Sequence, residues 1–169
     1  MRSPSKSKKG LDSMLYYLLA AVLVVIDQLV KLWVRGNIPL GTAIPFIPGL
    51  MDLTYYQNTG AAFSSFSGMT WLLALVSLAA SVAVAVLLAK DFFPGRLGRL
   101  TLSLILAGAV GNLIDRVFLR FVTDMFQTTF MNFAIFNVAD ICVVAGGILM
   151  VVYVLFFWDK DKEKLHDAS

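Results

Sequence analysis

Four long apolar stretches dominate the pattern of hydrophobic and polar positions along this chain of 169 residues. They cover residues 14–34, 71–89, 100–114 and 141–158, and the last is expected to begin near Phe136. About 20 apolar residues are enough for a helix to cross the hydrocarbon core of a bilayer. The pattern therefore predicts an all-α membrane protein with four transmembrane helices.

The segment between the first two stretches, residues 35–70, has a different pattern. Pro39, Pro45 and Pro48 interrupt any helix, and residues 50–57 are rich in side chains that favour strands. We expect a β-rich segment here, a small hairpin or curved sheet lying outside the membrane at its surface. An ordinary polar loop is the alternative that the sequence leaves open.

The composition supports a membrane location. Hydrophobic residues make up 59% of the chain, the mean hydropathy is +0.79, and 15% of residues are charged, against roughly a quarter in soluble domains. We expect residues 1–169 to form a single membrane-embedded domain. The net charge of +3 does not imply nucleic acid, because the basic residues gather at the chain ends and in one short loop. With one cysteine, Cys142, and one histidine, His166, we expect no disulfide, no metal and no cofactor.

The distribution of lysine and arginine predicts the orientation. These residues concentrate in segments 1–13, 90–99 and 159–169, whereas segment 35–70 has Arg35 alone. Because cytoplasmic segments carry the excess of Lys and Arg, both termini are expected in the cytoplasm. Residues 1–13 are expected to be a disordered tail and residues 159–169 an exposed charged tail. Segments 35–70 and 115–135 then share the outer face.

Three carboxylates, Asp115, Asp124 and Asp140, lie in an otherwise apolar part of the chain. Ionisable groups near a bilayer are costly and therefore suggest a functional site. Two carboxylates at such a boundary can share one proton and act as an acid–base pair. The spacing does not settle which two. Arg116 could neutralise Asp115, which favours Asp124 and Asp140, but these groups could also be helix-end charges wetted by interfacial water.

Polar and small residues inside the predicted helices suggest structural roles. Asp27 and Lys31 are four residues apart, on one helical face, and are expected to form an intramembrane ion pair. Gly108 and Gly111 lie near one face of the third helix and permit close helix packing. We also expect these glycines to leave room for acyl chains.

Five motifs, in this order, resemble those of the lipoprotein signal peptidases, the type II signal peptidases of bacteria. The resemblance runs from Val25 to the end of the fourth predicted helix. The motifs are Asp27 with Lys31, Asn58-Thr-Gly-Ala-Ala-Phe63, Gly108-Ala-Val-Gly-Asn-Leu-Ile-Asp-Arg116, Val122-Thr-Asp124 and Phe136-Asn-Val-Ala-Asp140. Each motif alone is weak, whereas all five together with four spans are highly specific.

The resemblance implies an aspartic peptidase of the bacterial cytoplasmic (inner) membrane, with its active site at the outer face and Asp124 and Asp140 as the catalytic dyad. The implied substrate is a prolipoprotein that already carries diacylglycerol on a cysteine, cut just before that cysteine. Further implied partners are membrane lipid and an inhibitory cyclic lipodepsipeptide, and a monomer is expected. Residues implied to bind substrate or brace the dyad are Asn58, Asn112, Arg116 and Asn137, while Asp115, Asp27 and Lys31 are implied to be structural.

Two positions depart from the family pattern. Arg120 stands where glycine is frequent, and Met125 stands where an aromatic residue is common.

A non-catalytic transporter subunit and a structural assembly protein are the alternative classes of protein. The transporter alternative predicts polar residues through the whole bilayer, which the second and fourth apolar stretches lack. We also expect the 35–70 segment to pair with the substrate backbone as an added strand.

Overall fold

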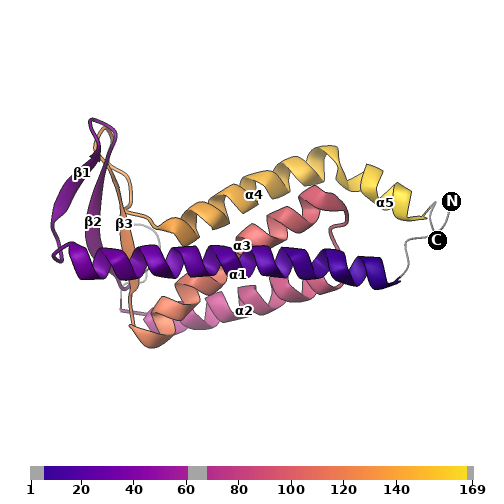
Figure 1. The fold of residues 1–169 in the computed structure, drawn as a ribbon, viewed down its shortest axis with the longest axis horizontal. Helices are drawn as coiled ribbons and strands as arrows, with labels where there is room; N and C mark the ends of the chain where they lie inside the picture. Colours follow the sequence, from indigo (N-terminus) through magenta and orange to yellow (C-terminus); the bar gives the residue numbers. More distant parts are fainter. Residues whose placement is uncertain (1–5, 61–67, 167–169) are drawn as a thin grey trace.

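A computed structural model of the chain describes residues 6–60 and 68–166. Four helices in this part are long and apolar enough to cross a membrane: Ser13–Asn37, Thr70–Ala89, Gly95–Phe118 and Val138–Phe156. They run along the long axis of the molecule, and a small sheet caps one end (Figure 1). The prediction of four spans is confirmed, as is the presence of β-structure after the first.

The elements follow one another in a simple order along the chain. They are α1 (Lys6–Asn37), β1 (Ala43–Ile47), β2 (Met51–Asn58), α2 (Thr70–Ala89), α3 (Gly95–Phe118), β3 (Val122–Thr128), α4 (Val138–Phe156) and α5 (Trp158–His166). The expectation of a disordered tail over residues 1–13 is wrong for residues 6–13, which begin α1. Lysine is a good helix former, and extending an existing helix avoids the cost of nucleation. Residues 1–5 and 61–67 lie outside the described part.

The sheet is antiparallel, with the strand order β1-β2-β3. A turn at Pro48-Gly49, with Gly49 at a φ of +73°, joins β1 to β2. β3 was expected to be part of a loop, but it pairs with β2 and places Tyr56 opposite Asp124. The prediction of a hairpin or curved sheet in segment 35–70 is confirmed, because β1 and β2 form an antiparallel hairpin. The alternative of an ordinary polar loop is wrong.

The sheet is held on the end of α1 by a small apolar cluster. Val34 of α1 and Ile38, the residue that follows this helix, pack with Met125 of β3, and all three are buried. Met125, one of the two departures from the family pattern, thus anchors β3 directly beside Asp124. The other departure, Arg120, has a φ of +67°, and its guanidinium lies 4.5 Å from the ring centroid of Trp71.

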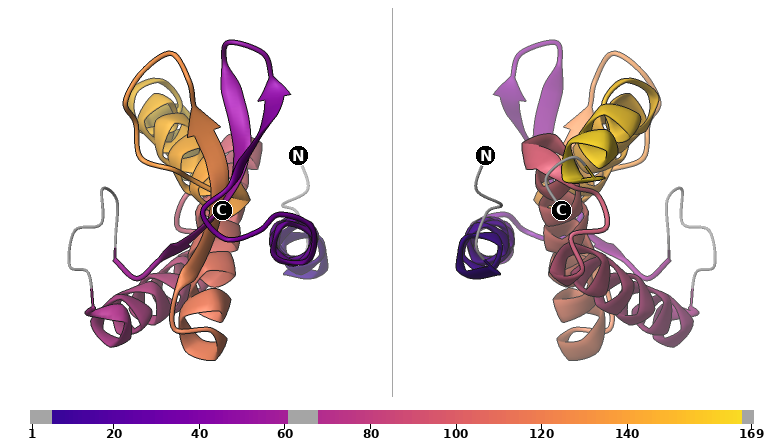
Figure 2. Two further views of the ribbon diagram at one scale, coloured as in Figure 1. Left: turned by 90° about the vertical axis from the view of Figure 1, so that its left-hand side faces the viewer. Right: turned by 90° about the vertical axis from the view of Figure 1, so that its right-hand side faces the viewer.

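α3 is the central helix of the bundle. The helices α1, α2 and α4 each pack on α3 and surround it when the bundle is viewed end-on (Figure 2). The glycines of α3 make this possible: a Cβ at Gly108 would overlap the carbonyl oxygen of Ala139, and a Cβ at Gly111 would lie 2.7 Å from Asp27 Oδ2. The expected close packing is therefore present. The expectation that these glycines leave room for acyl chains is wrong, because α4 and Asp27 fill that space.

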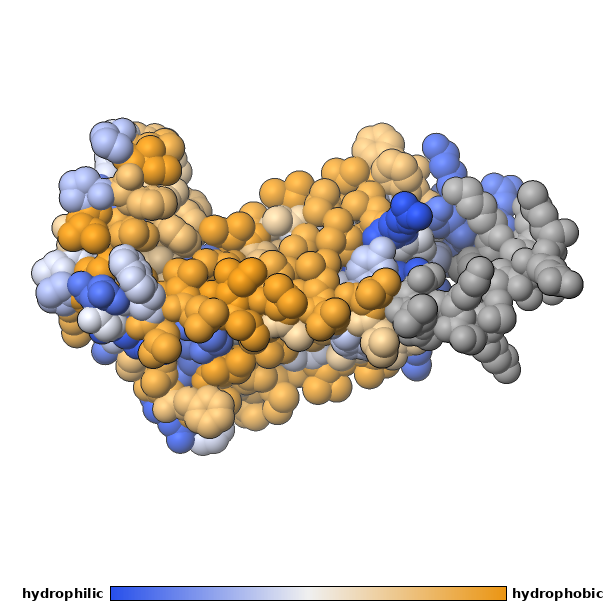
Figure 3. All heavy atoms as spheres, in the orientation of Figure 1, coloured by the Kyte–Doolittle hydropathy of each residue, from blue (hydrophilic) through white to orange (hydrophobic). Residues whose placement is uncertain are grey.

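The opposite end of the bundle is closed by polar and aromatic contacts. The hydroxyl of Tyr153, which is fully buried, donates to the carbonyl oxygen of Pro94 in the α2–α3 turn (2.7 Å). Arg99 forms two hydrogen bonds with Asp91 there. Apolar side chains cover the outside of the helices, while hydrophilic residues gather toward the two ends (Figure 3). This distribution suits a protein that lies across a bilayer.

Candidate active site

Polar side chains from five elements meet at the sheet end of the bundle. The elements are α1, β2, β3, α3 and the first turn of α4, and each supplies residues that the sequence singled out. Most of the group is buried, as the exposed fractions of Asp27 (1%), Lys31 (0%) and Asp124 (2%) show. Buried polar groups are stable only when hydrogen-bonded, so the contacts of each carboxylate define the site.

Asp124 lies in the middle of β3, where its carboxylate is held by two amides. Its Oδ2 accepts from Asn58 Nδ2 of β2 (3.0 Å), and its Oδ1 accepts from Asn137 Nδ2 (2.6 Å). Asn58 is close because the last residues of β2 pair with the first residues of β3. The strand pairing therefore delivers one of the two amides, and the start of α4 delivers the other.

Asp140 lies in the first turn of α4 and forms a capping box with Asn137. The side chain of Asn137 accepts from the backbone N–H of Asp140 (2.9 Å), and Asp140 Oδ2 accepts from the backbone N–H of Asn137 (3.1 Å). This arrangement satisfies donors that a helix start leaves unpaired. The second oxygen, Oδ1, accepts from Asn112 Nδ2 of α3 (2.8 Å).

Asn137 therefore joins the two candidate carboxylates. Its side-chain amide donates to Asp124 and its backbone amide donates to Asp140. Burial and, second to it, the negative charge of Asp140 raise the pKa of Asp124 to about 7, against the lowering effect of the hydrogen bonds from Asn58 and Asn137 and of the charge of Lys31. A carboxyl group with a pKa near 7 can gain or lose a proton at neutral pH, which is the property required of a general acid or base.

A buried cation lies behind this pair. Lys31 Nζ is 2.9 Å from Asp27 Oδ2 and 3.4 Å from Asp115 Oδ2, and it donates to Asn112 Oδ1 (2.9 Å). Asp27 in turn accepts from the backbone N–H of Ala139 (2.9 Å), another unpaired donor at the start of α4. The ion pair of Asp27 with Lys31 thus exists in the structure and ties α1 to α3 and α4.

The expected pairing of Asp115 with Arg116 is wrong. Adjacent residues on a helix point in different directions, and Asp115 instead meets Lys31, Arg35 Nη1 (4.0 Å) and the backbone N–H of Thr123 (2.9 Å). Arg116 donates from Nη1 to the hydroxyl of Ser77 (3.2 Å). Its buried Nε has no hydrogen-bond partner among the residues that the structure describes.

Sequence reasoning gave no role to two side chains of this group. Gln28 donates to Asp27 Oδ2 (3.1 Å) and Asp115 Oδ1 (3.3 Å), and Arg35 donates to the hydroxyl of Thr123 (2.9 Å). The available signal was their spacing, because Gln28 and Arg35 lie three and four residues from Lys31 and hence on the same face of α1. Within the described residues, no group of three or more His, Cys, Asp or Glu side chains is placed to hold a metal ion.

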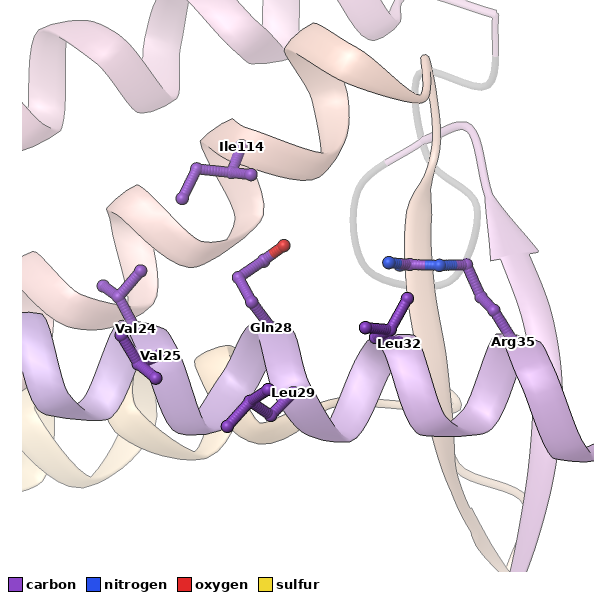
Figure 4. A pocket seen from close by; sticks show the side chains of 7 residues that line it. All are labelled: Val24, Val25, Gln28, Leu29, Leu32, Arg35 and Ile114. Carbon is purple, nitrogen blue, oxygen red and sulfur yellow. The ribbon is translucent and has the colours of Figure 1, made fainter.

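An apolar groove of about 400 Å³ lies between α1 and α3. Figure 4 shows its seven lining residues: Val24, Val25, Gln28, Leu29, Leu32, Arg35 and Ile114. Gln28 and Arg35 belong both to this groove and to the polar group. Neither Asp124 nor Asp140 lines the groove.

These features together define a class: a membrane protein of several spans with a pair of carboxylates, one buried and one half-buried, suited to acid–base chemistry. A family model described as signal peptidase (SPase) II matches residues 19–156. The chain is 41% identical over 155 residues to a lipoprotein signal peptidase of Latilactobacillus sakei, covering 91% of this chain and 99% of that protein. It is 44% identical over 140 residues to a lipoprotein signal peptidase of Enterococcus faecalis, covering 83% and 87%.

Solved structures agree with these sequence matches. A bacterial membrane enzyme determined at 2.3 Å resolution is similar with a TM-score of 0.78 and 30% identity, over 83% of this chain and 87% of that one. A second bacterial membrane enzyme, at 1.9 Å resolution, gives a TM-score of 0.76 and 30% identity, over 84% and 93%. The chain belongs to the signal peptidase II family and is an aspartic-type peptidase.

Proposed function

We propose that this enzyme removes the signal peptide from prolipoproteins whose cysteine already carries diacylglycerol, cutting the bond just before that cysteine. Asp124 and Asp140 act as the catalytic dyad, and no cofactor takes part. The observation that carries the proposal is that Asn137 hydrogen-bonds both carboxylates, one of which has a pKa of about 7. Such a pair holds one proton near neutral pH and can act as acid and base together.

The reaction needs no covalent intermediate with the enzyme. Water attacks the scissile carbonyl carbon while one carboxylate takes a proton from it and the other protonates the carbonyl oxygen. Asn58, Asn112 and Asn137 hold the two carboxylates in position, since each donates to one or both of them. Arg116, whose positive charge interacts with the negative charges of Asp140 and Asp124, is assigned to substrate binding.

The substrate reaches the dyad from the membrane. Asp140 is in the first turn of α4, so the carboxylates lie at the end of a span, where the cysteine of a lipid-anchored peptide is held. We propose that both termini are cytoplasmic and that the sheet end is the outer face of the bacterial cytoplasmic membrane. A cyclic lipodepsipeptide would inhibit the enzyme by placing its acyl chain in the lipid and its peptide ring at the dyad. The enzyme acts as a monomer.

Strand addition at the open edge of the sheet does not bring a substrate to Asp124. Within residues 6–60 and 68–166 the free edge is that of β1, and a strand added there would lie about 14 Å from β3 at about 4.8 Å per step. The outer edge of β3 next to Asp124 is occupied by Phe136, which exchanges backbone hydrogen bonds with Phe126 (2.8 and 3.1 Å). The expectation that segment 35–70 adds a substrate strand stays a prediction for residues 61–67, which lie outside the described part of the chain.

The test is cleavage of a lipidated prolipoprotein by purified enzyme in membranes free of endogenous peptidase. Asp124→Asn and Asp140→Asn should each lower the rate at least about 10²–10⁴-fold, the usual contribution of one general acid–base group. Asp52→Asn is the matched control, because Asp52 is a carboxylate of β2 in the same sheet that pairs with Gln127, away from the dyad. If either dyad variant cleaves near the wild-type rate, the assignment is wrong and Asp115 becomes the candidate.

A further inference from the structure

The contacts of Lys31 exceed what a structural ion pair requires. Lys31 is fully buried, and an ammonium group has three donors. Two of them face Asp27 and Asp115, which already neutralise the charge. The third contact is to the side-chain oxygen of Asn112, a neutral group, at 2.9 Å. This contact connects the cation to the candidate dyad, because Asn112 also holds Asp140.

The Asn112 amide is oriented by the charges at its two ends. Its oxygen accepts from Lys31 Nζ (2.9 Å) and from Asn137 Nδ2 (3.2 Å), and its nitrogen donates to Asp140 Oδ1 (2.8 Å). A flipped amide would put its NH₂ group against the ammonium and its oxygen against the carboxylate. A cation on the amide oxygen also polarises the group and strengthens the hydrogen bond that its nitrogen donates.

The two carboxylates of the dyad have unequal surroundings. Asp124 is 2% exposed, lies in a strand, and accepts hydrogen bonds from the neutral amides of Asn58 and Asn137. Asp140 is less buried, lies at the start of a helix where negative charge is favoured, and receives the amide that Lys31 polarises. Both differences favour negative charge on Asp140 over Asp124.

The charge balance of the whole cluster points the same way. Three cations face four carboxylates, so the cluster is neutral when one of the four carries a proton. The charged groups are Asp27, Lys31 and Arg35 of α1, Asp115 and Arg116 of α3, Asp124 of β3, and Asp140 of α4. Asp27 and Asp115 lie 2.9 and 3.4 Å from Lys31 Nζ, and this contact with a cation favours their negative charge, which leaves the proton to the dyad.

We infer that Lys31 is a positioning residue that acts through Asn112 to keep the negative charge of the singly protonated dyad on Asp140, so that Asp140 is the base and Asp124 the acid. In the first step Asp140 takes a proton from the attacking water, and Asp124 gives its proton to the carbonyl oxygen. In the second step the C–N bond breaks, the proton on Asp140 goes to the leaving amine nitrogen, and a hydroxyl proton of the intermediate returns to Asp124. The dyad is thereby restored, and the inference rests on the proposed peptidase function.

The test is the pH dependence of kcat/KM. Lys31→Met should move the acidic limb to higher pH by about one unit, the low end of the effect of a nearby opposite charge. Lys31→Arg should restore part of this shift. Since Lys31→Met leaves Asp27 and Asp115 without their cation, Asn112→Leu provides a second variant that keeps both ion pairs and removes the amide that links Lys31 to Asp140, together with its hydrogen bonds to Asp140 and Asn137. It should shift the acidic limb in the same direction.

Gln28→Met is the matched control for loosening of the cluster. Gln28 donates to Asp27 and Asp115 but does not touch Asn112. This variant should lower the melting temperature and leave the acidic limb in place. An unshifted limb in folded Lys31→Met or Asn112→Leu, or an equal shift in Gln28→Met, would overturn the inference. Wild-type enzyme that fails to cleave would instead overturn the proposed function.

The location of the proton has a spectroscopic readout. In wild-type enzyme near neutral pH, infrared spectra should contain the carbonyl stretch of a buried protonated carboxyl group. The frequency of this band should change in Asn58→Leu, because Asn58 donates a hydrogen bond to Asp124 Oδ2. An unchanged frequency in folded Asn58→Leu, with a changed one in Asn112→Leu, would assign the acid to Asp140 and refute the role given to Lys31.

Discussion

The contact between α3 and α4 at Gly108 permits a sharp test of how the dyad is positioned. A Cβ at this position would overlap the carbonyl oxygen of Ala139 and lie 2.5 Å from Val143 Cγ2, whereas ordinary contact begins at 3.4 Å. Relief of this overlap requires a movement of about 1 Å. A side chain can turn away, but the carbonyl oxygen belongs to the backbone of α4, one residue before Asp140.

Gly108→Ala should therefore lower both stability and activity. Overpacking of this kind costs about 1–3 kcal/mol. The gain in helix propensity from glycine to alanine, up to about 1 kcal/mol, opposes that cost. Movement of the first turn of α4 by about 1 Å shifts Asp140 relative to Asp124, and a misplacement of that size can reduce turnover about 10²-fold.

Gly147→Ala is the matched control, because a Cβ on Gly147 of α4 would have no atom within 4 Å. This variant receives the same gain in propensity without the overlap. Melting temperature in detergent and cleavage of a lipidated prolipoprotein should both be measured for the two variants. If Gly108→Ala matched Gly147→Ala in both assays, the argument that the α3–α4 contact positions the dyad would be refuted.

Three further predictions concern other parts of the molecule. The pKa of Asp124 is raised from 3.8 to about 7, so the folded state binds the proton more tightly than the unfolded state and is stabilised at low pH. Relative to Asp124→Asn, the wild type should lose on the order of 4 kcal/mol of unfolding free energy as the pH rises from 4 to 7. Melting temperatures measured across that range test this. Tyr153→Phe leaves a buried carbonyl of the α2–α3 turn unpaired and should cost about 1–3 kcal/mol of stability with unchanged turnover per folded enzyme, since this contact is at the end away from the dyad. In a Cys142→Ala background, Thr129→Cys should react with an impermeant thiol reagent added outside intact cells and Arg96→Cys should not; the opposite labelling would reverse the proposed orientation.

Sequence patterns identified the spans but not their limits. The third apolar stretch, 100–114, is the middle of a helix that runs from Gly95 to Phe118. Hydropathy finds the apolar part of a span, while the helix continues through Arg96 and Arg99 at one end and Asp115 and Arg116 at the other.

The strand β3 was not predicted from the sequence, for another reason. Its partner β2 lies more than 60 residues earlier, and pairing over that distance leaves no local signal.

For the candidate site, the sequence identified the residues but not most of the contacts between them. Motifs named Asp124, Asp140 and their asparagines, and the three-residue spacing of Asn137 and Asp140 suggested a common helical face. The pairing of Asp115 with Arg116 failed because neighbours in sequence diverge on a helix. The contact between Lys31 and Asn112 joins residues 81 apart and depends on how α1 packs against α3. Spacing within one helix cannot predict such a contact.

The lengths of α2 and α4 fix the depth of the dyad relative to lipid. α2 has 20 residues and α4 has 19, which gives about 30 and 28 Å at about 1.5 Å per residue. A typical hydrocarbon core is about 30 Å thick, so these helices have no length to spare. In a thicker bilayer the first turn of α4 would be drawn into hydrocarbon, or the lipid would have to thin around it. Turnover in vesicles of increasing acyl-chain length should therefore pass through a maximum and then decline, which makes membrane thickness a determinant of the enzyme's rate.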